Sequence, residues 1–349
     1  MNPNNYIIID GSEGEGGGQI LRTSITLSTI FQIPVEIFNI RSKRNNPGLR
    51  PQHVASIKAA SSICNAEVDN LAIGSHSIRF KPGRVQSKSL KINVGTAGSI
   101  TLILQLLIPA ASLGGADLDL EITGGTDVRW SPVIDYFKHV VLPSYRIVGI
   151  EANIETLRRG YFPRGEGLVR VSIKRSNGVS SINNLTPRKC NVKGISVCSN
   201  LPMHVAERQM ESAREYLVSK RIPLDESEIY LEKSFSPGSS ILIFSVGSEG
   251  PFLGGDAIGE IGKSAEKVGL QAAKKFSEEY LSGALFDRHV SDMIIAPLSV
   301  AKEKSSFLVS KLTNHLNTNL RIVSLFNHVN YDIIKNVNGS RKIEINPTK

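Results

Sequence analysis

The sequence predicts an α+β protein in which repeated βαβαββ-type units are interrupted by a smaller inserted βαββα domain. The first observation is that one order of glycine-rich turn, apolar helix, strand, polar loop, helix and two strands occurs twice, about 80 residues apart. The second is that a segment with a different order and long charged helices follows the second copy. A length of 349 residues also fits about two domains.

The first copy covers residues 16–81 and begins at the turn Gly16–Gly18. Its further elements are, in order, an apolar helix to about Ile30, a strand Val35–Ile40, a polar loop Arg41–Gln52, a helix His53–Cys64, and strands near Ala66 and at Ile78–Phe80. Glycine and proline mark the loops, and apolar side chains at helical or alternating spacing mark the elements.

The second copy covers residues 95–174, and a third is expected from Asp287 onward. The second contains a turn Gly95–Gly98, a helix to about Ala111, a strand Leu118–Thr123, a loop Gly124–Pro132, a helix Val133–Leu142, and strands around Val148–Ile154 and Val169–Ile173. The third contains helices His289–Ile295 and Asn314–Leu325 and strands at Ser306–Ser310, Tyr331–Ile334 and Arg341–Ile345.

The predicted insert covers residues 184–280, which leaves 1–183 and 281–349 for the larger domain. Its elements are a strand Val192–Cys198, a helix Met203–Lys220, strands Glu228–Lys233 and Ser240–Val246, and a charged helix Ser264–Tyr280. The polar stretch Arg175–Asn184 and the pair Ser282–Gly283 bound it.

Composition favours a polyanionic partner. Lys and Arg number 41 against 32 Asp and Glu, a formal charge of +9, which suits RNA or nucleotides. The three cysteines form no CxxC pair, as expected in a reducing compartment. The N-terminus does not read as a secretory signal, and no apolar run approaches the length of a membrane span. We therefore expect a cytoplasmic protein that does not associate with membranes.

A glycine-rich segment, Gly11–Arg22, follows an apolar strand and opens a helix. Free backbone N–H groups at such a place suit a phosphate. Glu15 offers a carboxylate to a divalent ion on triphosphate oxygens, and Gln19 and Arg22 lie one turn apart on the following helix. A plain turn with a helix start is the alternative.

A basic loop, residues 41–53, lies at the carboxyl end of the first copy's strand. Arg41, Lys43, Arg44 and Arg50 are gathered in it, a footprint for phosphates. A solvated basic loop without a ligand is the alternative.

The string Ala257–Ser264 resembles a phosphate-binding loop because Gly262, Lys263 and Ser264 precede a helix. Such a loop begins directly at the end of its strand, whereas the preceding strand is expected to end near Val246. We therefore expect a surface helix here.

His315 differs in context from His76, His139 and His328, because it lies in the polar stretch Leu312–Asn319 at the start of a helix. The apolar face of that helix is Leu316, Leu320 and Val323, so the imidazole can meet an anion at the helix N-terminus. The residues alone leave open whether it is a nucleophile or an ordinary surface histidine.

Several blocks in order resemble the RNA 3′-terminal phosphate cyclase family over nearly the whole chain. They are Asp10–Arg22, Pro47–His53, Gly95–Ser99 with Gln105, Gly124–Asp127, Arg159–Gly167, His204–Arg208, and the stretch from Gly254 to Gly269. The resemblance implies a large domain of repeats similar to the C-terminal domain of a translation initiation factor and a thioredoxin-like insert.

The resemblance also implies an activity: ATP-dependent conversion of an RNA 3′-phosphate into a 2′,3′-cyclic phosphate through an adenylyl-histidine, a ligase-class nucleotidyl transfer. It places the nucleophile at His315 and a metal-binding carboxylate, for Mg²⁺ or Mn²⁺, at Glu15. ATP is expected at Gln105 and at His289, Val290, Ser291, Asp292 and Met293. We assign the RNA end to Gln19, Arg22, Arg41, Arg44, Gln52 and His53.

The chain departs from the family pattern at two places. A run of three glycines reads Gly165-Glu166-Gly167 here, and His289 stands where tyrosine is frequent. Two other functions share the architecture: cyclase-like ribosome-assembly factors, which lack the histidine, and enolpyruvyl transferases, which have a turn similar to Gly95–Ser99. The presence of His315 favours the cyclase, while a homodimer is left open.

Overall fold

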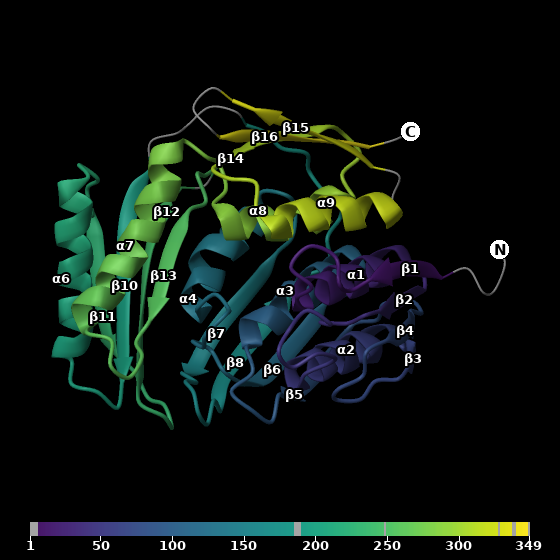
Figure 1. Ribbon diagram of the computed structural model, residues 1–349, viewed down its shortest axis with the longest axis horizontal. Coiled ribbons are helices and arrows are strands. Elements are labelled where there is room, and N and C mark those ends of the chain that lie inside the picture. Colours follow the sequence, from purple (N-terminus) through teal and green to yellow (C-terminus); the bar gives the residue numbers. More distant parts are fainter. Residues whose placement is uncertain (1–5, 185–189, 248, 327–328, 337–339, 348–349) are drawn as a thin grey trace.

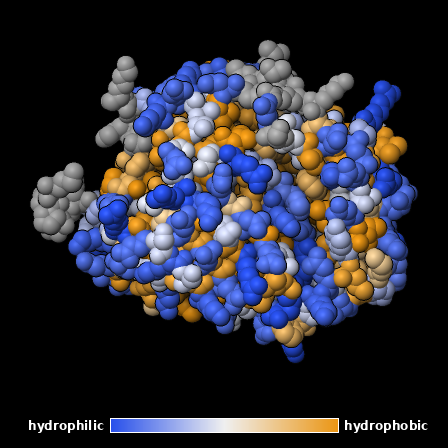
Figure 2. Space-filling view, turned by 180° about the vertical axis from the view of Figure 1, so that it is seen from behind, coloured by the Kyte–Doolittle hydropathy of each residue, from blue (hydrophilic) through white to orange (hydrophobic). Residues whose placement is uncertain are grey.

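The computed structural model describes residues 6–184, 190–247, 249–326, 329–336 and 340–347. In this part of the chain the protein is a mixed α+β structure with four four-stranded sheets. Three of them surround a central group of helices, and the fourth lies to one side (Figure 1). Hydrophilic side chains with scattered apolar ones cover the rear face (Figure 2).

The first unit has the strand order β1-β2-β4-β3. Its elements are β1 (Ile7–Asp10), α1 (Gly18–Phe31), β2 (Val35–Phe38), α2 (Pro51–Cys64), β3 (Glu67–Asp69) and β4 (Ile78–Lys81). β1 and β2 run parallel, and the other neighbours pair antiparallel. Ile78 and Phe80 alternate with exposed residues on β4, as a sheet with one covered face requires.

The second unit repeats this order as β5-β6-β8-β7. Its elements are β5 (Lys88–Asn93), α3 (Ile100–Leu113), β6 (Leu118–Gly124), a helix made of α4 (Ile134–Tyr136), η1 (Phe137–Val141) and α5 (Leu142–Arg146), then β7 (Ala152–Arg158) and β8 (Gly167–Ile173). The helix extends further, and β7 begins later, than the sequence predicts.

The third unit has the same order, β9-β14-β16-β15, but it begins earlier than expected. Its elements are β9 (Asn183–Asn184), α8 (Arg288–Leu298), β14 (Ser305–Val309), α9 (Asn314–Phe326), β15 (Asn330–Lys335) and β16 (Arg341–Asn346). β9 pairs in parallel with β14, so the intervening segment interrupts this unit and does not precede it. A strand of two asparagines has no apolar alternation that the sequence could reveal.

The intervening segment forms the fourth sheet, β11-β10-β12-β13. Its elements are β10 (Asn191–Ser199), α6 (His204–Ser219), β11 (Glu226–Leu231), β12 (Gly238–Val246), β13 (Gly254–Ile258) and α7 (Ala265–Ser282). It has a separate hydrophobic cluster, centred on Val192, Met210, Ile243 and Phe276. These elements lie beside the three-sheet body in Figure 1.

β13 is absent from the sequence prediction because it begins with two glycines, which weaken a strand pattern. Gly255 has to be glycine here, because a Cβ atom would lie 2.3 Å from the backbone oxygen of Ala272 on α7. The expectation that the strand before the Ala257–Ser264 string ends near Val246 is therefore wrong, since β13 ends at Ile258.

The phosphate-loop interpretation nevertheless gains no support. β13 is an edge strand antiparallel to β12. The Lys263 ammonium donates to the Gln271 side chain and to the Ile258 carbonyl at 3.5 Å, while the Ser264 hydroxyl caps α7. The polar groups of this motif therefore serve the fourth sheet and its helix.

The helices of the three units pack on one another in the centre. α1 contacts α3 and α9, and α3 and α9 both contact α8. The buried faces of α1 and α3 are rich in Ile and Leu, which supplies the apolar area that holds the three sheets together. This packing brings the N-terminal end of α9 close to that of α1.

No helix in the described ranges is long and apolar enough to cross a membrane.

Candidate active site

His315 lies on the first turn of α9, where that helix meets the loop before α1. The Thr313 hydroxyl accepts a 2.8 Å hydrogen bond from the Leu316 N–H, which is the usual cap of a helix start. The Gln19 side chain, on α1, donates to the backbone oxygen of His315 at 3.1 Å. Both helices therefore fix the backbone of this residue.

The His315 imidazole lies between two carboxylates. Its Nε2 is 3.1 Å from Oε2 of Glu15, and its Nδ1 is 3.5 Å from Oδ2 of Asp292. Asp292 is held in turn, because the Thr313 hydroxyl donates to its Oδ1 at 2.6 Å and the Asn319 amide donates to its backbone oxygen. The side chain of His315 is 39% exposed, so a substrate can reach it.

These neighbours raise the pKa of His315. The hydrogen bond to Asp292 makes the largest contribution, burial opposes it, and the charges of Asp292 and Glu15 reinforce it. A carboxylate on Nδ1 also keeps a proton on that nitrogen, which directs the lone pair of the neutral imidazole to Nε2. The ring is therefore arranged to act through Nε2.

Positive charge surrounds this histidine. Arg22 donates its Nε to Gln105 Oε1 at 3.0 Å, and burial lowers its pKa to about 10, so it remains charged at neutral pH. Arg44 lies 3.5 Å from Oε2 of Glu15, and its guanidinium borders Gly17 at the start of α1. A largely buried guanidinium with a neutral amide as its hydrogen-bond partner favours an anion in this place.

His53 is close to Arg22 but its imidazole is neutral. Burial is the main reason that its pKa falls to about 3, and the charges of Arg22, Arg41 and Arg50 add to the effect. Its Nδ1 accepts a 3.0 Å hydrogen bond from the Arg50 N–H, so Nε2 carries the hydrogen and points toward Gly18. A Cβ atom on Gly18 would lie 2.4 Å from this Nε2, so only glycine allows the contact.

Two other residues assigned to the RNA end make hydrogen bonds to other parts of the protein. Arg41 donates to the carbonyls of Asn46 and Gly48 at 2.6 and 3.1 Å, which closes the basic loop. Gln52 accepts from the Ser99 N–H at 3.2 Å, which joins this loop to the start of α3. These side chains organise the site as well as border it.

The segment assigned to ATP, residues 289–293, is the first turn and a half of α8. Asp292 reaches His315, whereas Val290 and Ser291 are fully buried. His289 is half-buried and meets the Tyr136 ring edge-on, 6.1 Å between centroids, and Met293 is 8% exposed. Asp287, which caps this helix, has its pKa raised to about 6, chiefly by burial.

The sequence does not predict that Asp292 pairs with His315. It also does not predict that Thr313 and Asn319 hold Asp292 in place. Thr313 follows the rule that threonine begins helices, so its capping role has a sequence signature. No sequence pattern connects Asp292 to His315, because they lie on different helices that tertiary packing brings together.

Glu15 fits a metal site only in part. It is half-exposed beside His315, and Mg²⁺ is commonly held by one or two carboxylates together with substrate phosphates. Among the described residues, no cluster of three or more histidine, cysteine or acidic side chains is placed to hold an ion. A metal at Glu15 therefore requires the triphosphate for most of its ligands.

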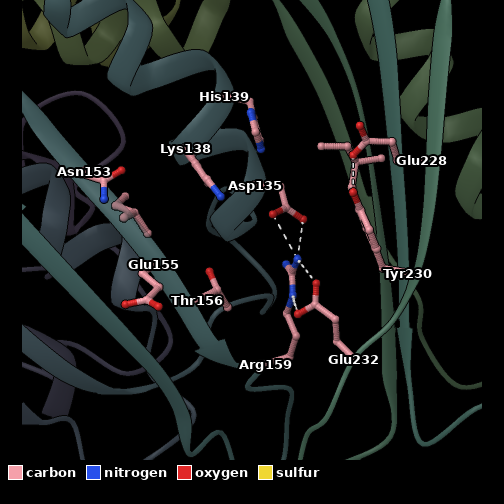
Figure 3. Close-up of a pocket in the computed structure, with 12 residues that line it drawn as sticks. Asp135, Lys138, His139, Asn153, Glu155, Thr156, Arg159, Glu228, Tyr230 and Glu232 are labelled. Atoms are coloured by element: carbon pink, nitrogen blue, oxygen red, sulfur yellow. Dashed lines mark hydrogen bonds and ion pairs between the residues drawn. The ribbon is translucent and has the colours of Figure 1, made fainter.

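A cavity of about 600 Å³ lies elsewhere, between the second unit and the fourth sheet. Arg159 borders it, paired with Asp135 at 2.8 Å and Glu232 at 2.9 Å, as Figure 3 shows. Burial alone lowers the pKa of Arg159, but Asp135 and Asp127 hold it well above its usual value. Since acidic side chains outnumber basic ones in its lining, this cavity suits neither ATP nor RNA.

Comparison with known proteins gives a consistent result. A sequence model described as RNA 3′-terminal phosphate cyclase matches residues 13–333. Proteins of that name from Caldivirga maquilingensis, Desulfurococcus amylolyticus and Thermococcus kodakarensis are 43%, 44% and 45% identical to this chain. The alignments cover 98%, 91% and 92% of both chains in each pair.

The matching blocks are therefore spread over the whole length of the protein and not confined to one motif. The chain belongs to the RNA 3′-terminal phosphate cyclase family.

Proposed function

We propose that this protein is an ATP-dependent enzyme that converts an RNA 3′-phosphate end into a 2′,3′-cyclic phosphate, with His315 as its nucleophile. The observation that carries the proposal is the His315 imidazole held between Glu15 and Asp292 at the start of α9. Carboxylates on both ring nitrogens, with arginines close by, suit a histidine that attacks a phosphate and carries a phosphoryl adduct.

In the first step, Nε2 of neutral His315 attacks the α-phosphorus of ATP. A P–N bond forms, and the P–O bond to pyrophosphate breaks. Asp292 keeps the Nδ1 proton in place and stabilises the positive charge that develops on the ring. The contact between Nε2 and Glu15 must break before this attack. The reactivity of His315 is therefore coupled to the binding of another group, such as the divalent ion, by Glu15.

Arg22 is the strongest candidate to hold a phosphate group. Its guanidinium is largely buried and remains charged, and among the described residues its hydrogen-bond partner is the neutral Gln105 side chain. Such a cation costs free energy unless an anion joins it. Gln105 and residues 289–293 lie on α3 and α8 beside it, with His289, Asp292 and Met293 as the most accessible members of the assigned ATP segment.

Glu15 is proposed to hold a divalent ion, Mg²⁺ or Mn²⁺, together with the triphosphate. When bound there, such an ion neutralises charge on the phosphates and favours departure of pyrophosphate.

In the second step an oxygen of the RNA 3′-phosphate attacks the adenylyl phosphorus, the P–N bond breaks, and His315 is released. The vicinal 2′-hydroxyl then attacks the terminal RNA phosphorus, loses its proton, and expels AMP. Positioning dominates this closure and in general supplies about 7–11 kcal/mol of barrier reduction. We assign the positioning to Gln19, Arg22, Arg41, Arg44, Gln52 and His53.

The domain division also belongs to the proposal. The separate sheet and hydrophobic cluster of residues 191–282 support an inserted domain, and the identical strand orders of the other sheets support a catalytic domain of three repeats. A relation of these parts to the initiation-factor and thioredoxin folds remains a prediction, as do a cytoplasmic location and a homodimer.

The decisive experiment is incubation with ATP labelled at the α-phosphate. The protein should acquire a label that is stable to alkali and labile to acid, as a phosphoramidate is. His315→Ala should take up none, and Asp332→Asn, an exposed acid on β15, is the matched control. A labelled His315→Ala protein would refute the proposed nucleophile.

A further inference from the structure

The loop between β6 and α4 presents Trp130 to solvent. This is the only tryptophan of the chain, and it is 95% exposed. Tryptophan is highly buried on average, so a ring left wholly in water is unusual. Its backbone has a φ of 68°, in the left-handed region that bulky residues avoid, so the fold holds the ring outward at some cost.

The loop around Trp130 is held firmly. Gly125 donates its N–H to the Gly98 carbonyl at 2.8 Å, the Ser131 hydroxyl donates to the Val128 carbonyl, and the Thr101 hydroxyl donates to the Pro132 carbonyl. The exposure of Trp130 therefore belongs to an ordered loop fastened to the start of α3.

A second exposed aromatic ring lies on the other loop that packs against residues 95–99. Phe162 is 77% exposed, and a Cβ atom on Gly165 of the same loop would lie 2.7 Å from the Cα of Ala97. Between Phe162 and Gly165, the Arg164 guanidinium makes no hydrogen bond or ion pair within the described part of the chain. Arg158, at the base of this loop, lies over the Phe235 ring at 4.4 Å.

These two loops are continuous with the proposed site of the RNA end. The glycine turn 95–99 lies between them, and its Ser99 N–H bonds to Gln52 of the basic loop. Gln105, further along the same helix, contacts Arg22. A strand whose 3′-phosphate lies near Arg22 and Arg44 can thus continue across residues 95–99 toward Trp130 and Phe162.

The chemistry of this surface fits single-stranded nucleic acid. Exposed aromatic rings stack on unpaired bases, and arginines between them attract the backbone. Arg129 is occupied by Glu260 at 2.5 Å, and Glu166 is an exposed acid of the Phe162 loop. Arg158 donates its Nε to the Glu166 backbone oxygen at 2.8 Å, and no carboxylate pairs with it in the described ranges, so Arg158 and Arg164 supply the positive charge. A nucleotide has one base, whereas two rings on separate loops suit successive bases of a strand.

We infer that Trp130 and Phe162 form a stacking platform for the bases of the RNA strand upstream of its 3′-phosphate. This inference rests on the proposed function. It adds a surface that holds the strand, separate from the groups that react with its end.

Tryptophan fluorescence tests the platform directly, because emission from this protein reports Trp130 alone. Titration with a short single-stranded RNA that ends in a 3′-phosphate should quench the emission, and ATP alone should leave it unchanged. Replacing single nucleotides near the 3′ end by abasic residues should identify the base that stacks. Quenching by ATP with none by RNA would assign the ring to adenine and overturn the inference.

Variants provide the second measurement. Trp130→Ala should weaken RNA binding by about five- to 150-fold, the range expected for loss of one stacked base, and Trp130→Phe should lose less. Val218→Ala removes a comparably exposed apolar side chain on α6 and should bind RNA normally. Phe162→Ala should weaken binding as well.

Measuring enzyme adenylation tests the proposed function separately from the stacking platform, because this step involves no RNA. If wild-type protein forms the adenylate and Trp130→Ala binds RNA as tightly as wild type, the platform is wrong and the proposed function stands. If wild-type protein forms no adenylate at His315, the proposed function itself fails.

Discussion

Replacing Asp292 by asparagine keeps the size of the side chain and removes the charge beside His315. The Oδ2–Nδ1 distance is 3.5 Å, longer than the roughly 2.7–2.9 Å of a strong charge-assisted hydrogen bond. A charge-assisted hydrogen bond contributes about 1.5–3 kcal/mol, and we expect the contribution of Asp292 to lie in the lower half of that range. This corresponds to a loss of about 13- to 45-fold in the rate of enzyme adenylation at high pH, where His315 is neutral.

The pH dependence gives this prediction its sign. Asp292 raises the pKa of His315 by favouring the charged imidazole. In the proposed mechanism only the neutral form attacks ATP. The adenylation rate of the wild type should therefore rise with pH through this raised pKa and then level off. In Asp292→Asn the midpoint should move to lower pH, so the deficit should shrink as the pH falls.

Single-turnover incorporation of labelled AMP, measured at a series of pH values, resolves both quantities. Asp332→Asn should match wild type in both. A lower plateau with an unmoved midpoint would mean that Asp292 only supports the start of α9, and an unchanged profile would exclude any role for it.

Four further substitutions test other groups that the sequence singles out. Glu15→Ala should slow adenylation and weaken its dependence on divalent ion, and an unaltered metal titration would show that Glu15 is only part of the turn. Lys263→Ala should form the His315 adenylate normally, because its ammonium serves Gln271 and Ile258; loss of ATP binding in the folded variant would revive a phosphate loop there. Arg44→Ala should spare adenylation but slow transfer to RNA by about ten- to a hundredfold, increasingly so at high salt, in single-turnover assays on preadenylated enzyme. Arg41→Ala should show the same transfer defect and also a lower melting temperature, because Arg41 closes its own loop. Normal transfer with lost adenylation in either arginine variant would place the loop on the triphosphate.

Most helices and the longer strands could be predicted because their apolar spacing is regular. β9 and β13 could not: the first is a pair of asparagines, and the second opens with glycines that the packing of α7 requires. At Glu166 the structure explains a departure from the family pattern that the sequence shows. Its φ of 52° lies in the left-handed region, which explains why the family pattern has glycine at this place.

The residues of the candidate site could be predicted from the sequence better than the contacts between them. Glu15, Arg22 and His315 carry recognisable chemistry in recognisable blocks, and the structure brings them together. The pairing of His315 with Asp292, the neutral state of His53 and the use of Arg41 within its own loop depend on burial and tertiary distances, which a single sequence does not contain.

Glu15 contacts Nε2 of His315, and Gln19 contacts its backbone oxygen. Both residues come from the opposite end of the chain. Glu15 and His315 are 300 positions apart, and α9 belongs to the last of the three units. During synthesis on the ribosome, the loop before α1 therefore emerges long before His315 does. If His315 is the nucleophile, a chain released early contains the arginines proposed to attract phosphates but lacks the imidazole that attacks ATP, so it would neither consume ATP nor leave adenylated RNA ends behind.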